Sequence, residues 1–318
     1  MTDRVARILF SGIYVTIPWL SKLSFGGPMK NLRGAVAVIT GAGSGIGRAL
    51  ALELAGHGAQ LALADVNQAG VEETRTLAMN ANAQANVRTY VVDVGDAGAV
   101  EAFAGQVQKD FGRASLLINN AGVALFGTFA EVSLADMEWL MRINYWGVVY
   151  GCKLFMPMLE REPEAHIVNI SSVFGLIAPA GQTAYGSSKF AVRGFSQALR
   201  LELKAAGSKV QVTCVHPGGI RTNVANAARA GAGTSPDANA AAKALFSKVV
   251  ETSPEEAAKV IIQGVLTNNG RVLIGADARR IDMIQRLFPF RSGDMLSDSF
   301  EKRAAKAGIV LPNRKQGK

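Results

Sequence analysis

Short, mostly apolar runs alternate with longer segments of helical spacing over most of this 318-residue chain. Runs of four to seven residues at 35–39, 60–64, 87–92, 115–118, 165–170, 209–215 and 271–275 each predict a buried strand. Helices are expected at 48–55, 69–81, 97–111, 133–158 and 184–206, and another begins at 253–256, where a serine caps and a proline opens the first turn. This alternation predicts an α/β fold with a doubly wound parallel sheet.

The carboxyl ends of the predicted strands are expected to meet. Right-handed crossovers place the ends of parallel strands on one edge of the sheet, where a crevice for a ligand forms. The residues expected at this edge are Gly41, Asp65, Asp93, Asn119, Ser172 and Pro217.

The two ends of the chain do not follow the alternating pattern. We predict an N-terminal extension at 1–30, a single catalytic domain at 31–280 and a C-terminal helix with a basic tail at 281–318. The apolar stretch 8–20 has thirteen residues, whereas a membrane-spanning helix needs about twenty. Three interpretations stay open: peripheral contact with a membrane surface through Trp19, packing on a partner subunit, or sequence upstream of a start at Met29.

A glycine-rich segment, Thr-Gly-Ala-Gly-Ser-Gly-Ile-Gly at 40–47, joins the first predicted strand to the first predicted helix. Glycines permit positive φ angles and let the backbone approach a pyrophosphate, which then lies at the positive end of the helix dipole. An isolated glycine-rich run is also typical of an ordinary turn, but the position between strand and helix favours a dinucleotide site of the Rossmann type. The expected cofactor contacts in this segment are Gly41, Ser44, Gly45, Ile46 and Gly47.

A carboxylate follows the second predicted strand. Asp65 lies twenty residues after Gly45, where dinucleotide-binding folds place a residue that binds the ribose hydroxyls. The same charge repels the 2′-phosphate of NADP, and neither Ser44 nor Val66 supplies a cation for that phosphate. We therefore predict NAD as the preferred cofactor over NADP. A solvated carboxylate at a strand end is the alternative interpretation.

Composition and charge exclude several other classes. Cys152 and Cys214 both lie in apolar context, which favours a reduced, cytoplasmic setting over a disulfide framework. The three histidines form no cluster with metal-ligand spacing, so we expect no metal. Much of the net charge of +9 comes from the two ends of the chain, and we expect no nucleic-acid partner. Membrane association through 8–20 stays open.

Tyr185 and Lys189 form a candidate acid–base pair. They are four residues apart on a predicted helix, so their side chains share a face. The ammonium group of Lys189 can lower the pKa of the phenol, and each unit of lowering requires about 1.4 kcal/mol. Tyr185 would then act as general base in one direction and general acid in the other. This spacing alone is also typical of a surface helical pair.

Five motifs in this order resemble the classical short-chain dehydrogenase/reductase (SDR) family. They are the glycine segment 40–47, Asn-Asn-Ala-Gly at 119–122, Ser171-Ser172 after the fifth strand, Tyr185-x-x-x-Lys189, and His-Pro-Gly-Gly-Ile-Arg-Thr at 216–222. The resemblance covers roughly 32–275 and implies a Rossmann-type fold, an NAD(P) cofactor and a homo-oligomer, either a dimer or a tetramer.

The resemblance also implies roles for single residues. Ser172, thirteen residues before Tyr185, matches the family's catalytic serine, which stabilises the developing alkoxide. Asn144 matches the asparagine that holds a water near the lysine and completes a proton relay. The further cofactor contacts that the resemblance implies are Asp93, Val94, Asn120, Ala121, Gly122, Tyr185, Lys189, Pro217, Gly218, Ile220 and Thr222.

The sequence therefore predicts an NAD(P)-dependent oxidoreductase that interconverts a secondary alcohol and a ketone by hydride transfer. The alternative is a non-catalytic dinucleotide sensor or scaffold, which loss of Ser172, Tyr185 or Lys189 would favour; all three are present. A sugar epimerase is disfavoured, because the related epimerases have longer chains with differently spaced glycines.

Substrate identity is only loosely indicated. Residues 123–126, 174–177 and those after Thr222 are expected to face the substrate. The segment 225–242 is rich in Ala, Gly and Asn and predicts a mobile lid rather than a core helix. An apolar face formed by Ile281, Ile284, Leu287 and Phe288 would close over a lipophilic substrate or seal a contact. An apolar alcohol or ketone is the expected substrate.

Overall fold

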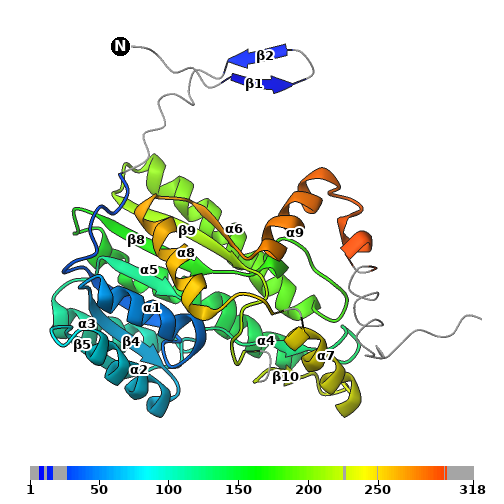
Figure 1. Cartoon of the computed structure of the whole chain (residues 1–318), viewed down its shortest axis with the longest axis horizontal. Coiled ribbons are helices and arrows are strands. Elements are labelled where there is room, and N and C mark those ends of the chain that lie inside the picture. Colours follow the sequence, from blue (N-terminus) through cyan, green and yellow to red (C-terminus); the bar gives the residue numbers. More distant parts are fainter. Residues whose placement is uncertain are drawn as a thin grey trace, which may run out of the picture.

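A seven-stranded parallel sheet forms the centre of the protein (Figure 1). The computed structural model describes residues 7–10, 13–16, 27–224, 227–248, 250–296 and 298. The strands of the sheet are β3 (Val36–Thr40), β4 (Gln60–Asp65), β5 (Val87–Val91), β6 (Leu116–Asn119), β8 (Ala165–Ile170), β9 (Val210–Pro217) and β11 (Arg271–Ile274). Their order is β11-β9-β8-β6-β3-β4-β5, so β3 lies between β4 and β6. This is the topological switch point, because β4 and β5 are added on one side of β3 and the later strands on the other. The predicted Rossmann-type fold is confirmed.

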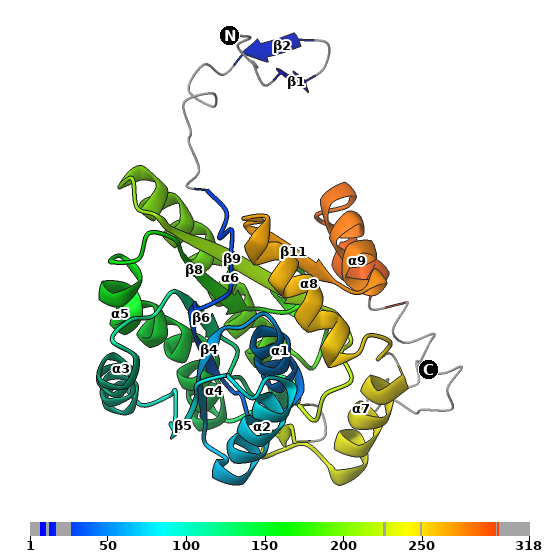
Figure 2. The same cartoon turned by 60° about the vertical axis from the view of Figure 1, so that its left-hand side comes forward.

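Helices cover both faces of the sheet (Figure 2). The principal helices are α1 (Gly45–Gly56), α2 (Gln68–Ala81), α3 (Ala97–Phe111), α4 (Leu134–Met141), α5 (Gly147–Leu159), α6 (Thr183–Ala205), α7 (Pro236–Lys248), α8 (Pro254–Leu266) and α9 (Ala276–Leu287). Because successive side chains of a strand point to opposite faces, Ile39 packs in the core formed with α1, α2 and α8, while Val38 packs in the core formed with α3, α5 and α6. Burial on both faces explains why the central strands β3 and β6 are almost entirely apolar, whereas the edge strand β5 also contains Arg88 and Thr89.

Predicted helix boundaries agree best where a capping residue marks them. Asp96 precedes α3 and accepts hydrogen bonds from the N–H groups of Gly98 at 2.8 Å and Ala99 at 3.1 Å. Ser253 precedes α8, and its hydroxyl accepts from the Glu256 N–H at 3.1 Å. Both helices therefore begin where the local chemistry satisfies free N–H groups of the first turn.

The single long helix predicted at 133–158 is wrong in one respect. A π-helical segment, Arg142–Trp146, separates α4 from α5. A π turn contains more residues than an α turn, so it shifts the apolar period between the two helices. Asn144 lies in this π segment with its side chain fully buried.

A small cap lies beside the carboxyl edge of the sheet. β7 (Leu125–Phe126) pairs in parallel with β10 (Arg229–Ala230), and α7 follows. Within 225–242, α7 occupies the second half. Its side chains at 236–244 are exposed or partly exposed, so it is not a core helix. This helix is rich in alanine, which favours helix without producing an apolar period. Residues 225 and 226 lie outside the described residues, and the mobility of the segment stays a prediction.

The apolar face predicted near the C-terminus divides into two parts. Ile281 is buried on α9 and packs with Val173 of a short 3-10 helix, η3 (Val173–Gly175), while Ile284 is partly buried against the same cluster. Leu287 and Phe288 are exposed. Ile281 and Ile284 thus pack against η3, whereas Leu287 and Phe288 face outward.

The described part of the N-terminal segment is a hairpin. β1 (Arg7–Phe10) pairs antiparallel with β2 (Ile13–Thr16), while Trp19 and the basic residues after 300 lie outside the described residues. Within the described residues, none of the helices has the length and apolarity that a bilayer crossing requires. The division at residues 30 and 280 stays a prediction, although α9 runs across residue 281.

Two buried histidines make an acid-sensitive core. His166 on β8 bonds through Nε2 to the hydroxyl of Thr213 at 2.7 Å, and His216 on β9 donates from Nδ1 to the Ser172 carbonyl at 3.0 Å. Burial lowers the pKa of His166 to about 3 and that of His216 to about 4. In the unfolded chain each imidazole has a pKa near 6.5, so between these values only the unfolded state takes up the proton. The free energy of unfolding therefore falls as pH decreases below about 6.5.

We expect His166→Gln, which keeps an N–H donor but does not titrate, to weaken this pH dependence. Each such histidine adds about 1 kcal/mol per pH unit to the slope. Urea denaturation at about pH 7 and about pH 5 measures the slope in the wild type and the variant. His57→Gln is the control, because His57 is exposed on the surface next to Glu53. Equal slopes in the wild type and His166→Gln would contradict the prediction.

Candidate active site

The loop between β3 and α1 leaves space that only glycine can provide. Gly41 has a φ of 65°, and a Cβ atom there would lie 2.8 Å from the Ala121 Cα. A Cβ atom on Gly47 would lie 2.1 Å from the Gly41 carbonyl oxygen. Both positions therefore exclude a side chain, and the loop can bring its backbone close to a ligand.

The first turn of α1 carries N–H groups that no side chain caps. Ser44 occupies the N-cap position without a side-chain capping hydrogen bond, and the first turn contains no acidic residue. An uncapped helix N-terminus after a glycine loop is suited to an anion such as the pyrophosphate of a dinucleotide. The predicted contacts at Ser44, Gly45, Ile46 and Gly47 thus lie together at one helix end.

Asp65 lies at the end of β4, against the glycine loop. Its Oδ2 accepts a hydrogen bond from the Gly43 N–H at 2.8 Å, and its Oδ1 accepts from the Asn67 N–H at 2.9 Å. A carboxylate oxygen can accept more than one hydrogen bond, so both oxygens keep capacity for ribose hydroxyls. These acceptors fit the ribose hydroxyls of a dinucleotide.

Thr40 and Asn120 connect the end of β6 to the glycine loop. The Asn120 side-chain amide donates to the carbonyl oxygens of Thr40 at 3.0 Å and Gly41 at 3.1 Å. The Thr40 hydroxyl accepts from the N–H groups of Asn120 and Ala121, both at 3.1 Å. The predicted contacts Asn120 and Ala121 therefore lie beside the loop. Thr40 is a contributor that the sequence analysis did not assign, although it opens the glycine motif.

The pair Asp93 and Val94 follows β5 at the same edge of the sheet. Asp93 is exposed and its Oδ1 accepts from the Gly95 N–H at 2.8 Å, while Val94 is buried. The pair forms a turn, and its contact with adenine stays a prediction.

The segment after β9 lies beside the cradle, which consists of the glycine loop together with the first turn of α1. A Cβ atom on Gly45 would lie 3.0 Å from the Thr222 Cγ2, so this segment borders the glycine loop. The Gly219 N–H donates to Asp277 Oδ2 at 2.8 Å, and a Cβ atom on Gly218 would lie 2.2 Å from an oxygen of the same carboxylate. Asp277, in the first turn of α9, thus holds the segment that carries Pro217 and Ile220. The sequence analysis missed Asp277 because the contact is long-range.

Ser172 and Tyr185 meet at the end of β8. The Ser172 hydroxyl lies close enough to the Tyr185 phenol to lower the pKa of the phenol, and it accepts from the Phe174 N–H at 3.1 Å. The neighbouring Ser171 hydroxyl donates to the backbone carbonyl of Lys189 at 2.8 Å. The structure therefore places Ser172, rather than Ser171, beside the phenol.

Lys189 lies one helical turn after Tyr185 and is buried. Its Nζ donates to the Ile170 carbonyl at 3.1 Å and lies 5.7 Å from the centre of the Tyr185 ring. A Cβ atom on Gly122 would lie 3.4 Å from this Nζ and 3.2 Å from Asn144 Oδ1. The lysine, the asparagine and Gly122 are therefore brought together, as the resemblance implied.

Asn144 is fixed by the backbone of the strand-end segment after β6. Its Oδ1 accepts from the Val123 N–H at 2.8 Å, and its Nδ2 donates to the Val123 carbonyl at 3.0 Å and to the Ser188 hydroxyl at 3.2 Å. These contacts orient the amide within the π segment described above.

Burial sets the protonation of the acid–base pair. It raises the pKa of Tyr185 above its ordinary value, while the hydrogen bond to Ser172 acts in the opposite direction. Burial also lowers the pKa of Lys189 to about 8. At neutral pH the cofactor-free site therefore holds a protonated phenol beside an ammonium group.

Comparisons with known proteins agree with this geometry. The family model described as short chain dehydrogenase matches residues 35–233. SadH of Mycobacterium tuberculosis is 46% identical over 259 residues, which cover 81% of this chain and 92% of SadH. Estradiol 17-beta-dehydrogenase 11 of Rattus norvegicus is 31% identical over 268 residues, 84% of each chain. A short-chain dehydrogenase/reductase from Burkholderia phymatum, solved in complex with NAD, aligns with a TM-score of 0.75 and 28% identity over 91% of this chain and all of its own.

The chain belongs to the short-chain dehydrogenase/reductase family. This is a family of oxidoreductases that bind NAD(P) on a Rossmann fold. The resemblance that the five motifs indicated is confirmed.

Proposed function

We propose that this protein interconverts a secondary alcohol and a ketone by hydride transfer, with NAD preferred over NADP. The observation that carries the proposal is the junction of Ser172, Tyr185 and Lys189 at the sheet edge that also holds the glycine cradle. A proton-transfer group and a dinucleotide cradle on the same edge fit dehydrogenase chemistry.

In this proposal each residue acts on the substrate oxygen or on its proton. When bound, NAD(P) accepts or donates the hydride. The Ser172 hydroxyl holds the substrate oxygen beside the phenol, and Tyr185 takes its proton in oxidation and returns it in reduction. Lys189 stabilises the phenolate electrostatically, and Asn144 holds a water that continues the proton path.

We infer an apolar substrate from the side chains around the phenol. The ring of Phe174 contacts the Tyr185 ring edge-on, with 6.2 Å between the ring centres. Ala124 and Phe126 form an apolar cluster with Tyr185 under the cap. The name of the rat relative refers to estradiol, which supports the inclusion of steroid-sized alcohols in a test.

The test is NADH production from NAD by the purified protein across secondary alcohols graded from small and polar to steroid-sized. Turnover that increases with apolar size supports both the reaction and the substrate class. The absence of NADH production with every alcohol of the panel, with NADH binding intact, would favour the non-catalytic sensor instead.

The Asp65→Ala variant tests the cofactor preference. We expect the Kd for NADH to rise about tenfold or more, because charge-assisted hydrogen bonds to the ribose are lost. The Kd for NADPH should fall, since the repulsion of the 2′-phosphate disappears. Fluorescence titration with both nucleotides measures the two constants. Glu101→Ala on the exposed side of α3 is the control, and an unchanged preference in Asp65→Ala would remove the carboxylate from ribose recognition.

A homo-oligomer, a dimer or a tetramer, belongs to the same proposal. Trp146 and Phe190 are large apolar side chains that are exposed on the π segment and on α6, where a second copy would cover them. Light scattering on the purified protein measures the mass, and a monomer at micromolar concentration would contradict this part.

A further inference from the structure

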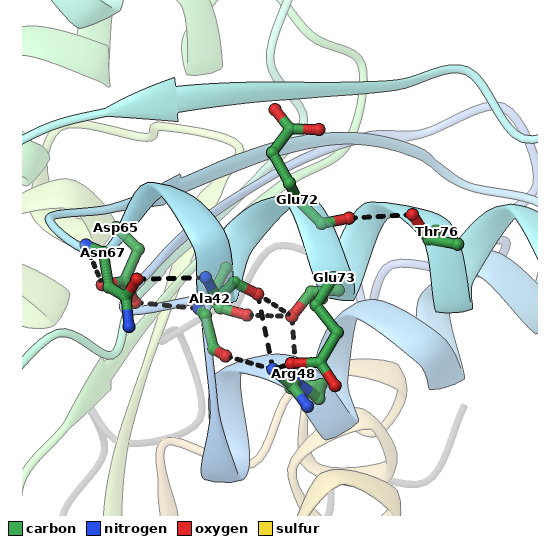
Figure 3. A network of polar contacts seen from close by, with 10 residues as sticks. Ala42, Arg48, Asp65, Asn67, Glu72, Glu73 and Thr76 are labelled. Atoms are coloured by element: carbon green, nitrogen blue, oxygen red, sulfur yellow. Dashed lines mark hydrogen bonds and ion pairs between the residues drawn. The ribbon is translucent and has the colours of Figure 1, made fainter.

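Arg48 joins the glycine loop to helix α2 on the side away from Asp65 (Figure 3). Its Nη2 donates to the Gly43 carbonyl at 2.6 Å and forms an ion pair with the Glu73 carboxylate, also at 2.6 Å. The same nitrogen lies 3.4 Å from the Gly70 carbonyl. The guanidinium group is therefore shared between a loop of the cofactor cradle and the first turns of α2.

Thr74 extends this connection into the core. Arg48 Nε donates to the Thr74 hydroxyl at 3.0 Å, and that hydroxyl bonds to the Ala42 carbonyl at 2.9 Å. The threonine is fully buried. Two consecutive carbonyl groups of the loop, those of Ala42 and Gly43, are thus held by side chains that meet at α2.

Gly43 is fixed from both sides. Its carbonyl accepts from Arg48, and its N–H donates to Asp65 Oδ2 at 2.8 Å. A Cβ atom on Gly43 would lie 2.9 Å from that same oxygen, so the carboxylate and the loop backbone are in close contact. The Gly43 N–H shares its peptide group with the Ala42 carbonyl that Thr74 holds, and the Gly43 carbonyl belongs to the next peptide group, which Arg48 holds. The Asp65 carboxylate therefore bonds to a backbone segment that is fixed on both sides.

We propose that Arg48 is a positioning residue for nucleotide selection. By holding Gly43 it sets the direction of the Asp65 carboxylate, so the preference for NAD depends on the Arg48–Thr74 connection as well as on Asp65. The inference rests on the proposed NAD preference. On this inference Arg48 does not serve a 2′-phosphate, because its guanidinium is paired with Glu73 and directed at backbone carbonyls.

Release of Asp65 has opposite consequences for the two nucleotides. NADH loses a well-directed acceptor for its ribose hydroxyls. NADPH has only the 3′-hydroxyl of that ribose as a donor, so it loses less, and the movable carboxylate repels its 2′-phosphate less. A general distortion of the loop would instead weaken the binding of both nucleotides equally, because both bind their pyrophosphate in the same cradle. The ratio of the two dissociation constants therefore separates positioning from mere structural support.

The experiment measures Kd for NADH and NADPH by fluorescence titration in Arg48→Met and Thr74→Val, with melting temperatures recorded for each. Arg48→Met keeps the apolar stem, and Thr74→Val is nearly isosteric, so it serves if the first variant does not fold. We expect the Kd for NADH to rise about tenfold in both and that for NADPH to change by no more than about twofold. Arg75→Met, which removes a half-exposed ion pair with Glu72 on the same helix, is the matched control and should change neither constant.

Two results would overturn the inference: a parallel rise of both constants in Arg48→Met and Thr74→Val, or no change in either. A wild-type protein that binds NADPH more tightly than NADH would instead contradict the NAD preference of the proposed function, and one that binds neither would contradict the proposed function itself. These outcomes are distinguishable in one titration series.

Discussion

The Tyr185→Phe protein is expected to bind NADH within about twofold of the wild type and to lose turnover by a factor of about a thousand, a typical effect for a group that transfers a proton. Phenylalanine keeps the ring that contacts Phe174 and lacks only the hydroxyl that lies beside Ser172. The measurement is kcat/KM for an alcohol that the wild type oxidises, together with fluorescence titration of NADH.

Tyr90→Phe is the matched control for this loss. Its hydroxyl donates to the Asp110 carboxylate near the end of α3, so the same chemical change is made away from the site. Turnover should then remain near that of the wild type. Turnover that survives in Tyr185→Phe would exclude Tyr185 as the acid–base group, while loss of NADH binding would indicate damage to the fold.

The second large effect is expected at Gly47, where alanine should raise the Kd for NADH by a factor of about a hundred or more. The new Cβ atom would lie 2.1 Å from the Gly41 carbonyl oxygen and 2.7 Å from the Asn120 amide nitrogen. Two atoms at such distances cannot coexist, so the loop must open and the N–H groups of α1 lose their alignment with the pyrophosphate. Fluorescence titration of NADH measures the loss.

Gly56→Ala is the control on the same helix. A Cβ atom there meets nothing within 4 Å, so the change alters only the local helix propensity. Circular dichroism reports whether the Gly47 variant is still folded. A folded Gly47→Ala protein with unchanged NADH affinity would show that the cradle does not hold the nucleotide as proposed.

The sheet could be predicted from the sequence because its signals are local. Strands such as β3 and β6 are apolar runs of the right length, and glycine or a capping side chain marks turns of the chain between strands and helices. The position of Asp65 followed from the same logic, since a strand end fixes where its carboxylate lies. Tyr185 and Lys189 followed from the period of a helix.

The remaining contributors could not be predicted because their partners are distant in the sequence. Asp277 contacts Gly219, and Thr74 contacts Ala42, across intervening helices and strands, so no local pattern encodes these contacts. Helix α7 lacks an apolar period because it belongs to the cap and does not pack against the core of the sheet. The pairing of β7 with β10 involves only two residues from each strand, too few to give a strand signal.

The π segment Arg142–Trp146 has a consequence for how this enzyme can vary. It lets one continuous helical segment pack in two apolar clusters. On α4, Leu140 packs with Leu125, while on α5 the ring of Phe155 contacts that of Phe103 on α3. Removing one residue here would restore α-helical phasing and rotate one half against the other by about 100°. The helical phase of this segment, and not only the chemistry of its side chains, thus sets where Asn144 points. Insertions and deletions in this stretch should therefore be tolerated poorly.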